Sequence, residues 1–230
     1  MKYCSYIALL FFIACGTTRK ENNKPVTELP PFWNDIQHFK KQDSINPPPQ
    51  HAILFIGSSS FTKWTDVQNY FPGYPIINRG FGGSTLLDQL RYVEDIVFPY
   101  NPKQIVIYCG ENDLASSDTV TAPMVFDRFK QLFNIIRAKT KAAVAYISMK
   151  PSPSRRHLFS KMREGNTMIK DFLTLENSRG PGASVFIDVH QKMLNKEGQP
   201  IPEIFLDDSL HMNAKGYSIW KNEIEPYLMK

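Results

Sequence analysis

Small, polar and titratable residues gather directly after several apolar runs of this sequence. They occupy the segments Gly57–Ser60, Asn78–Thr85, Gly110–Asp113 and Asp207–Asn213. Together these segments hold serines, a histidine with nearby carboxylates, glycines and an amide side chain. Acyl transfer needs residues of these types: one as the nucleophile, one as a base with a group that orients it, and others as hydrogen-bond donors to an oxyanion. The consecutive serines at 58, 59 and 60 leave open which of them is the nucleophile.

The elements that must position these segments follow a regular alternation. Short apolar, β-branched runs cover residues 52–57, 75–80, 104–110, 143–149 and 184–189, and segments with helical spacing cover about 60–70, 84–98, 121–140, 156–177 and 213–228. Strands without polar alternation are typical of parallel sheets buried on both faces. Strand and helix in alternation predict a single doubly wound α/β domain. Its ligands bind outside the carboxyl ends of the strands, where the polar segments lie.

Other chemistries have weaker support. Gly57–Phe61 lacks the second glycine of a G-x-S-x-G elbow, and Arg79–Gly83 is neither a dinucleotide fingerprint nor a P-loop. The five histidines show no paired spacing, so we expect no metal site. The net charge of +5 is spread along the chain and comes without a nucleic-acid-binding motif. Cys109 stands in the apolar run QIVIYC and is expected to be a small core residue.

Four blocks of the sequence resemble those of the GDSL-type SGNH hydrolases, from the first strand to the last helix. The resemblance implies a three-layer α/β/α sandwich around a central five-stranded parallel sheet, a flavodoxin-like fold, and a carboxylic ester hydrolase without a cofactor. The family nucleophile lies two places after the first glycine, which here is Ser59. Ser58 stands where the family name has Asp, and Ser60 where it has Leu.

The remaining blocks imply the other site residues. In the second block Gly83 would donate its backbone N–H to the oxyanion, with Gly82 as the rival and Gly80 as a weaker one. In the third block Asn112 would donate a hydrogen bond to the oxyanion from its side-chain amide. The backbone N–H of Ser59 would donate another.

Asp113, next to that asparagine, is expected to brace its loop through backbone amides. In the last block Asp208 and His211 are three residues apart, close enough for the carboxylate to orient the imidazole. Asp207 is a nearby alternative to Asp208. Asp188 and His190 form a rival pair, whose spacing in a strand gives no acid–base relay.

The N-terminal residues predict export and anchoring. Residues 1–14 have Lys2 and an apolar run too short to span a bilayer, as in a signal peptide. Phe12–Gly16 resembles a bacterial lipobox, which implies lipidation of Cys15 and an extracytoplasmic, membrane-anchored protein. Residues 15–31 are expected to form a tether and residues 32–230 the hydrolase domain. Within it, Phe32, Trp33, Ile36 and Phe39 recur at helical spacing and predict a first amphipathic helix.

The substrate is the least constrained part of this interpretation. A short-acyl or O-acetyl ester of a glycan suits an extracytoplasmic lipoprotein. A lysophospholipid or other lipid ester is the alternative, and a non-catalytic carbohydrate-binding module on a decayed hydrolase is the competing class. Trp64, Phe71 and Tyr74 are candidates for an acyl pocket or for the core, and Lys150–Pro153 for a substrate rim or a rigid loop. The sequence does not fix the oligomeric state.

Overall fold

Five parallel strands form the centre of the protein in a computed structural model that describes residues 1, 29–179 and 183–230. The strands are β1 (Ile53–Gly57), β2 (Ile76–Gly80), β3 (Gln104–Tyr108), β4 (Ala143–Ile147) and β5 (Ser184–Ile187). Their order in the sheet is β2-β1-β3-β4-β5, which is the flavodoxin-like order. The five strands predicted from the apolar runs, and the parallel sheet, are confirmed.

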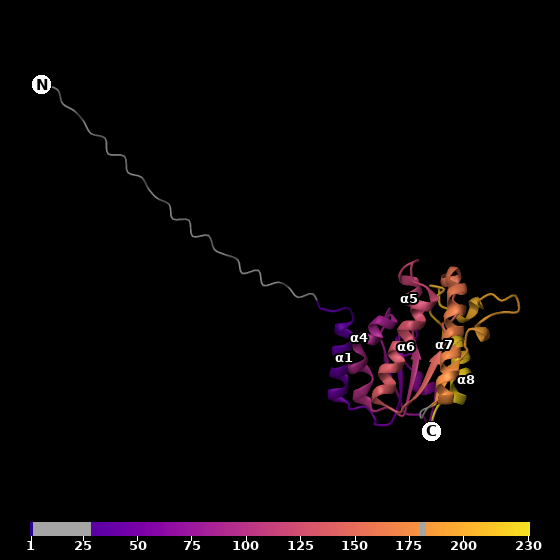
Figure 1. Ribbon diagram of the computed structural model, residues 1–230, viewed down its shortest axis with the longest axis horizontal. Coiled ribbons are helices and arrows are strands. Elements are labelled where there is room, and N and C mark those ends of the chain that lie inside the picture. The colour runs from indigo at the N-terminus through magenta and orange to yellow at the C-terminus, as the bar shows by residue number, and fades with distance from the viewer. Residues whose placement is uncertain (2–28, 180–182) are drawn as a thin grey trace. The chain divides into compact units, whose positions relative to one another are not determined.

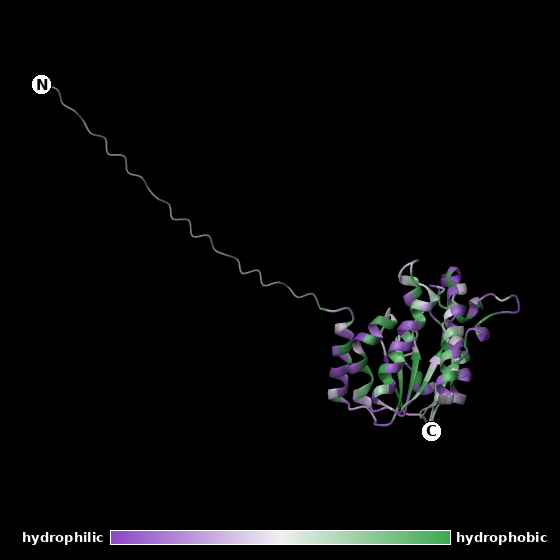
Figure 2. Cartoon of the chain, viewed as in Figure 1, coloured by the Kyte–Doolittle hydropathy of each residue, from purple (hydrophilic) through white to green (hydrophobic). Residues whose placement is uncertain are grey.

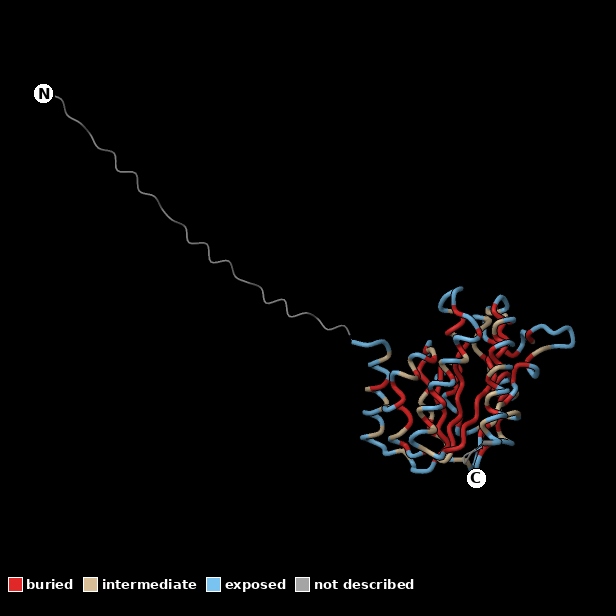
Figure 3. The backbone as a smooth tube through the Cα atoms, viewed as in Figure 1, coloured by how far each residue is buried: buried red, intermediate tan, exposed pale blue. Residues whose placement is uncertain are grey.

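Helices cover both faces of the sheet (Figure 1). One face carries α1 (Trp33–Ile45), α4 (Leu86–Ile96), α6 (Ala122–Lys139) and α7 (Phe159–Arg179), and the other carries the short α2 (Ser59–Thr62) and α3 (Val67–Tyr70) with α8 (Ala214–Ile224). Alternate strand residues supply the two cores: Leu54 and Ile56 face the first set, and Ile53 and Phe55 the second. The central strands β1, β3 and β4 are buried throughout and mostly apolar, whereas the edge strands β2 and β5 are partly exposed (Figures 2 and 3). The predicted three-layer sandwich is confirmed.

Short helical turns complete the chain. They are α5 (Glu111–Ser116) and the 3₁₀ segments η1 (Phe98–Tyr100), η2 (Pro153–Leu158), η3 (Gln191–Met193), η4 (Pro202–Ile204) and η5 (Glu225–Tyr227). Residues Pro31–Lys230 form one compact unit. The predicted signal peptide, Cys15 and the tether up to residue 28 lie outside the described residues. No helix in the described part of the chain combines the length and the hydropathy that crossing a membrane requires.

The single helix predicted over residues 60–70 is wrong. The segment instead forms α2 and α3, separated by a turn around Trp64. The Trp64 side chain is fully buried and stacks on Tyr217, with ring centroids 4.7 Å apart. Burying this ring against α8 takes the backbone off a continuous helical path, which periodicity alone did not reveal. The helix α5 was also not predicted, because six residues are too few to show a helical period.

The first helix is held to the sheet edge by Arg79 of β2. Its guanidinium lies 5.1 Å from the centroid of the Phe39 ring and 4.9 Å from that of Tyr100. It also donates to the Tyr100 hydroxyl at 2.7 Å and pairs with Asp43 of α1. Cation–π contacts and a charged hydrogen bond thus attach α1 to the edge of the sheet.

Gly57 ends β1 in a conformation that excludes a side chain. Its φ is +146°, and a Cβ atom there would lie 1.9 Å from the carbonyl oxygen of Tyr108 on the neighbouring strand. That strand approaches closely because the Ser58 N–H donates to the same Tyr108 oxygen at 3.0 Å. Both the strained φ and the contact with backbone, which cannot move aside, therefore favour glycine.

We expect Gly57→Ala to lower the free energy of unfolding by roughly 3–5 kcal/mol, because strain and overpacking add. Gly73→Ala is the matched control, since Gly73 also has positive φ (+89°) but a Cβ there meets nothing within 4 Å. Its cost should be about 1 kcal/mol. Urea denaturation followed by circular dichroism measures both. Equal losses in the two variants would show that the contact with Tyr108 contributes nothing.

Candidate active site

A chain of hydrogen bonds joins three of the predicted site residues. His211 Nε2 lies 2.9 Å from Ser59 Oγ, and His211 Nδ1 lies 2.6 Å from Asp208 Oδ2. A carboxylate only accepts, so Nδ1 carries the proton and Nε2 is left to accept from the serine hydroxyl. Ser59 begins α2 directly after β1, while the other two residues lie in the turn before α8. Such an arrangement can pass a proton from the serine to the imidazole during nucleophilic attack.

The turn that carries Asp208 and His211 is built around the aspartate itself. Asp208 Oδ1 accepts from the backbone N–H groups of Leu210 (3.0 Å) and His211 (2.9 Å), and Ser209 adopts a left-handed φ of 54°. Burial alone would raise the pKa of Asp208, but hydrogen bonds from the His211 ring and from these two amides outweigh it. They hold the pKa of this carboxyl well below its ordinary value. The carboxylate is therefore charged wherever the imidazole is able to act as a base.

Asp207, the alternative to Asp208, is exposed and makes no hydrogen bond or ion pair with any described residue. The structure thus brings Asp208, and not its neighbour, to the imidazole. Because Asp208 and His211 are three residues apart in one turn, the Asp208 carboxylate accepts hydrogen bonds both from the imidazole and from backbone N–H groups.

The loop after β2 faces the serine and presents unpaired donors. A Cβ atom at Gly82 would lie 3.9 Å from Ser59 Cβ, whereas at Gly83 (φ +86°) it would meet nothing within 4 Å. The backbone N–H groups of Ser59, Gly82 and Gly83 donate to no acceptor among residues 29–179 and 183–230. These groups can therefore stabilise an oxyanion. Gly80 is excluded from this role because it lies inside β2, where a Cβ would collide with Phe61.

Asn112 lies at the same edge of the sheet and is tied to this loop. Its Nδ2 donates one hydrogen to the Ser84 carbonyl at 3.1 Å, which leaves the second hydrogen for a ligand. Next to it, the buried Asp113 accepts from the Leu86 N–H at 2.9 Å, as expected of a residue that braces backbone amides. It also pairs with Arg128 of α6 at 2.7 Å, a partner that sequence spacing did not indicate.

A buried ion pair beneath Asn112 was missed by the sequence analysis. Glu111 and Lys150 side chains are only 5% and 2% exposed, and Lys150 Nζ lies 2.8 Å from Glu111 Oε2. The Tyr108 hydroxyl donates to the same oxygen at 2.5 Å, and Ser152 Oγ lies 3.4 Å from the other. Lys150 was predicted to belong to a substrate rim or to a rigid loop. The available signal was a lysine shortly after the apolar strand β4, since buried lysines require a partner.

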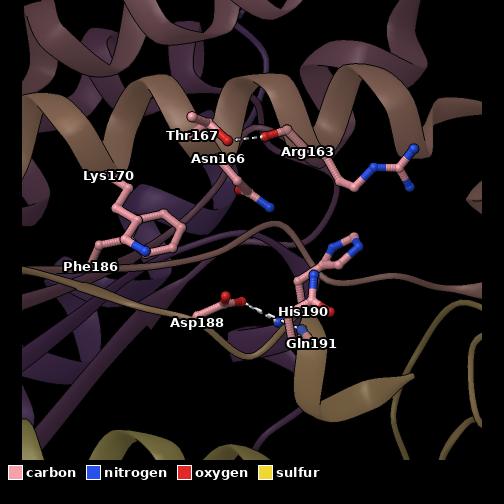
Figure 4. A pocket seen from close by; sticks show the side chains of 8 residues that line it. All are labelled: Arg163, Asn166, Thr167, Lys170, Phe186, Asp188, His190 and Gln191. Atoms are coloured by element: carbon pink, nitrogen blue, oxygen red, sulfur yellow. Dashed lines mark hydrogen bonds between the residues drawn. The ribbon is translucent and has the colours of Figure 1, made fainter. Parts of the chain in front are cut away.

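The rival pair of Asp188 and His190 forms no relay. Asp188 Oδ1 accepts from the His190 and Gln191 backbones and from Ser148, while His190 Nδ1 donates to the Met149 carbonyl at 2.9 Å. Burial lowers the pKa of this imidazole. Figure 4 shows both side chains at a separate pocket of about 170 Å³ between α7 and the end of β5.

Other candidates are parts of the core. Trp64 and Phe71 are fully buried, and Tyr74 packs against the same cluster, so the aromatic residues considered for an acyl pocket belong to the packing under α2 and α8. Cys109 is buried, and its burial raises the pKa of its thiol well above the ordinary value. Within the described residues no three His, Cys, Asp or Glu side chains are grouped so as to hold a metal ion.

Removing one partner of the Glu111–Lys150 pair should destabilise the protein strongly, whereas replacing both partners by neutral side chains should destabilise it little. We expect Lys150→Met to lower the free energy of unfolding by about 3–5 kcal/mol, because it removes the nearer positive charge from the buried Glu111 carboxylate and leaves only Arg155, 4.0 Å away. Adding Glu111→Gln should recover most of that loss. Lys40→Met, which breaks the exposed Lys40–Asp95 pair (51% and 31% exposed), should cost under about 1 kcal/mol. Urea denaturation of all variants tests this, and a similar cost for Lys150→Met and Lys40→Met would contradict it.

Comparison with known proteins agrees with this architecture. The model of the GDSL-like Lipase/Acylhydrolase family matches residues 54–219. The isoamyl acetate-hydrolyzing esterase of Saccharomyces cerevisiae is 24% identical over 175 residues, which cover 69% of this chain and 70% of that protein. The N-acylneuraminate cytidylyltransferase of Escherichia coli is 24% identical over 216 residues; they cover 93% of this chain, which spans only about half (48%) of that relative.

Solved structures share the fold. A GDSL-like lipase from Bacteroides thetaiotaomicron matches with a TM-score of 0.70 and 20% identity, over 83% of this chain and 95% of that one. A catalytic mutant of an acetylxylan esterase from Geobacillus stearothermophilus matches with a TM-score of 0.60 and 16% identity, over 77% and 93%. The family match over residues 54–219 includes each strand-end segment from Ser59 to His211. The chain therefore belongs to the GDSL-like lipase/acylhydrolase family and is a carboxylic ester hydrolase.

Proposed function

We propose that this esterase removes short acyl groups, above all O-acetyl groups, from a glycan through an acyl-enzyme on Ser59. The observation that carries the mechanism is the hydrogen-bond chain from Ser59 Oγ through His211 to Asp208, with distances of 2.9 and 2.6 Å. Every link has the donor and acceptor that a general base needs before attack.

In the first half-reaction, His211 Nε2 takes the hydroxyl proton as Ser59 Oγ bonds to the ester carbonyl carbon. The carbonyl oxygen becomes an oxyanion, which the N–H groups of Ser59 and Gly83 and the Asn112 amide stabilise, with Gly82 as the alternative donor in the loop. The imidazolium, stabilised by Asp208, then gives its proton to the leaving alcohol as the carbon–oxygen bond breaks. In the second half-reaction water, activated by the same imidazole, releases the acid and restores the serine.

Two observations favour a short acyl group. Phe61, Trp64 and Phe71, which follow Ser59 in the sequence, are fully buried in the core, so they offer no apolar groove to a long chain. Two similar proteins are described by acetate chemistry, one as an isoamyl acetate-hydrolyzing esterase and the other as an acetylxylan esterase. A lipid acylhydrolase is the second candidate, supported by the family, whose description includes lipases.

We expect Ser59→Ala to lower kcat/KM for p-nitrophenyl acetate by about 10⁴-fold or more, because the nucleophile is lost. Ser60→Ala is the control: Ser60 Oγ is buried without a partner among the described residues, so its removal breaks no hydrogen bond. Across p-nitrophenyl esters from acetate to palmitate, the serine-dependent rate should be highest on acetate. A rate that rises with chain length would favour the lipid acylhydrolase, and activity that survives Ser59→Ala would refute the mechanism.

The cellular site is a second proposal, which rests on the sequence of the N-terminus. We propose that cleavage before Cys15 and lipidation of its thiol anchor the protein to a bacterial membrane, facing away from the cytoplasm. Residues between Cys15 and Pro31 are polar and without periodicity, which suits a tether. More than one acyl chain would make such an anchor stable.

Metabolic labelling with an alkyne fatty acid tests the anchor. The full chain expressed in a bacterium should take up the label and partition into a detergent phase. Cys15→Ser should abolish both results, whereas Cys4→Ser, which changes the other cysteine of the N-terminal segment, should abolish neither. Labelling that persists in Cys15→Ser would place the lipid elsewhere or refute it.

A further inference from the structure

Arg155 lies between two segments that carry site residues. It belongs to η2, which follows β4, and the N–H of its neighbour Ser154 donates to the carbonyl of Ser209 at 3.0 Å. Ser209 stands inside the turn that presents Asp208 and His211. On its other side, Arg155 Nε is 4.0 Å from Oε1 of Glu111, the residue before Asn112. The guanidinium is therefore held at the edge of the proposed catalytic centre.

The charge of Arg155 is only partly balanced by the protein, through a long ion pair with Glu111. Glu111 is the carboxylate it approaches, and Lys150 already pairs with that group at 2.8 Å. The hydroxyl groups of Tyr108 and Ser152 also reach the Glu111 oxygens. Around Glu111, one negative charge thus faces two positive ones, so this group of three side chains has one positive charge in excess.

The guanidinium also lacks hydrogen-bond acceptors. Its Nε is fully buried without a partner, and none of its N–H groups donates to a residue in the described ranges, although the side chain is only 25% exposed. Other partly buried arginines differ: Arg79 donates to Tyr100 and Asp43, and Arg128 to Asp113. A buried donor without an acceptor is costly. A carboxylate bound to the terminal N–H groups of the planar guanidinium would supply acceptors to them and the missing negative charge, while the buried Nε would stay covered by protein.

We infer that Arg155 is a substrate-binding residue that holds a carboxylate on the alcohol part of the ester, so that the preferred substrates are acetyl esters of acidic sugars such as uronic acid residues. The inference rests on the proposed function. The alcohol side is indicated because His211 must protonate the leaving oxygen. That places the departing group beside the imidazole, on the turn to which the Arg155 segment is hydrogen-bonded.

A pair of matched acetate esters tests this binding role. 4-Acetoxybenzoate carries a carboxylate on the leaving group, and 4-acetoxybenzamide is its neutral counterpart. We expect kcat/KM of the wild-type enzyme to be higher for the benzoate. Arg155→Gln should reduce that preference by about 10- to 100-fold, chiefly through KM, because a hydrogen bond to a charged group is lost. Arg155→Lys should lose part of it, since a point charge replaces the fork.

Arg156→Gln is the matched control, because Arg156 is the next residue on the same 3₁₀ segment and is exposed. It removes the same charge and should leave the preference within about 3-fold of the wild type. An equal loss in Arg156→Gln would indicate only general attraction and overturn the inference. No preference for the benzoate in the wild type, or a preference that Arg155→Gln leaves intact, would overturn it as well.

Two further results are informative. One distinguishes a carboxylate bound on the alcohol part of the ester from one bound on the acyl part, and the other distinguishes a failure of the Arg155 role from a failure of the esterase mechanism. Mono-4-nitrophenyl succinate and 4-nitrophenyl pentanoate differ by a carboxylate on the acyl side, and an Arg155-dependent preference confined to that pair would overturn the alcohol assignment. If the enzyme hydrolyses the acetate ester of 4-acetoxybenzamide in a Ser59-dependent way and shows no preference for 4-acetoxybenzoate, the role of Arg155 is refuted and the esterase mechanism still stands. Hydrolysis of neither acetate would contradict both.

Discussion

The geometry of the site depends on the carbonyl oxygen of Gly57, on which three donors converge. The Phe81 N–H reaches it at 2.9 Å, the Ser84 hydroxyl at 3.2 Å and the Gln89 amide at 3.3 Å. These bonds fix the loop after β2 against the residue two positions before Ser59. Because the Ser84 carbonyl in turn accepts from Asn112, the segments that follow three adjacent strands form one network. The oxyanion donors are therefore set before any substrate binds, which is the condition for electrostatic stabilisation of a transition state.

The two carboxylates near this network, Asp208 and Glu111, are stabilised by different kinds of partner. Asp208 is 46% exposed on its side chain and is stabilised by local hydrogen bonds within its own turn. Glu111 is almost fully buried and depends on Lys150, which lies in the segment after β4. The exposed carboxylate keeps its charge through donors that are close in sequence. The buried one meets Lys150 only if β3 and β4 are correctly packed, so the position of the adjacent Asn112 depends on the tertiary fold.

Much of this could be predicted from the sequence, because the sheet is covered on both faces and its strands are mostly apolar. Parallel strands in register bring the segments after β1, β2 and β3 together, and the family resemblance adds His211, which lies next to Ser59 although the two are 152 residues apart. Long-range polar pairs were not predictable in the same way. Glu111 with Lys150, and Asp113 with Arg128, are separated by 39 and 15 residues and follow no periodic pattern. The turn at Trp64 was missed because it is decided by packing against Tyr217, which no local propensity encodes.

The exposure of the hydrogen-bonded chain bears on the kind of substrate such a site admits. Ser59 is half-buried, the His211 side chain is 15% exposed and Asp208 is more open still. A serine that solvent can reach is also accessible to an ester attached to a large, hydrated polymer. A serine at the bottom of a deep apolar pocket would be accessible only to an ester that leaves the hydrated polymer surface. An open site also gives up the selectivity that enclosure provides. Discrimination must then come from polar groups at the rim, and a partly buried guanidinium without an acceptor is such a group.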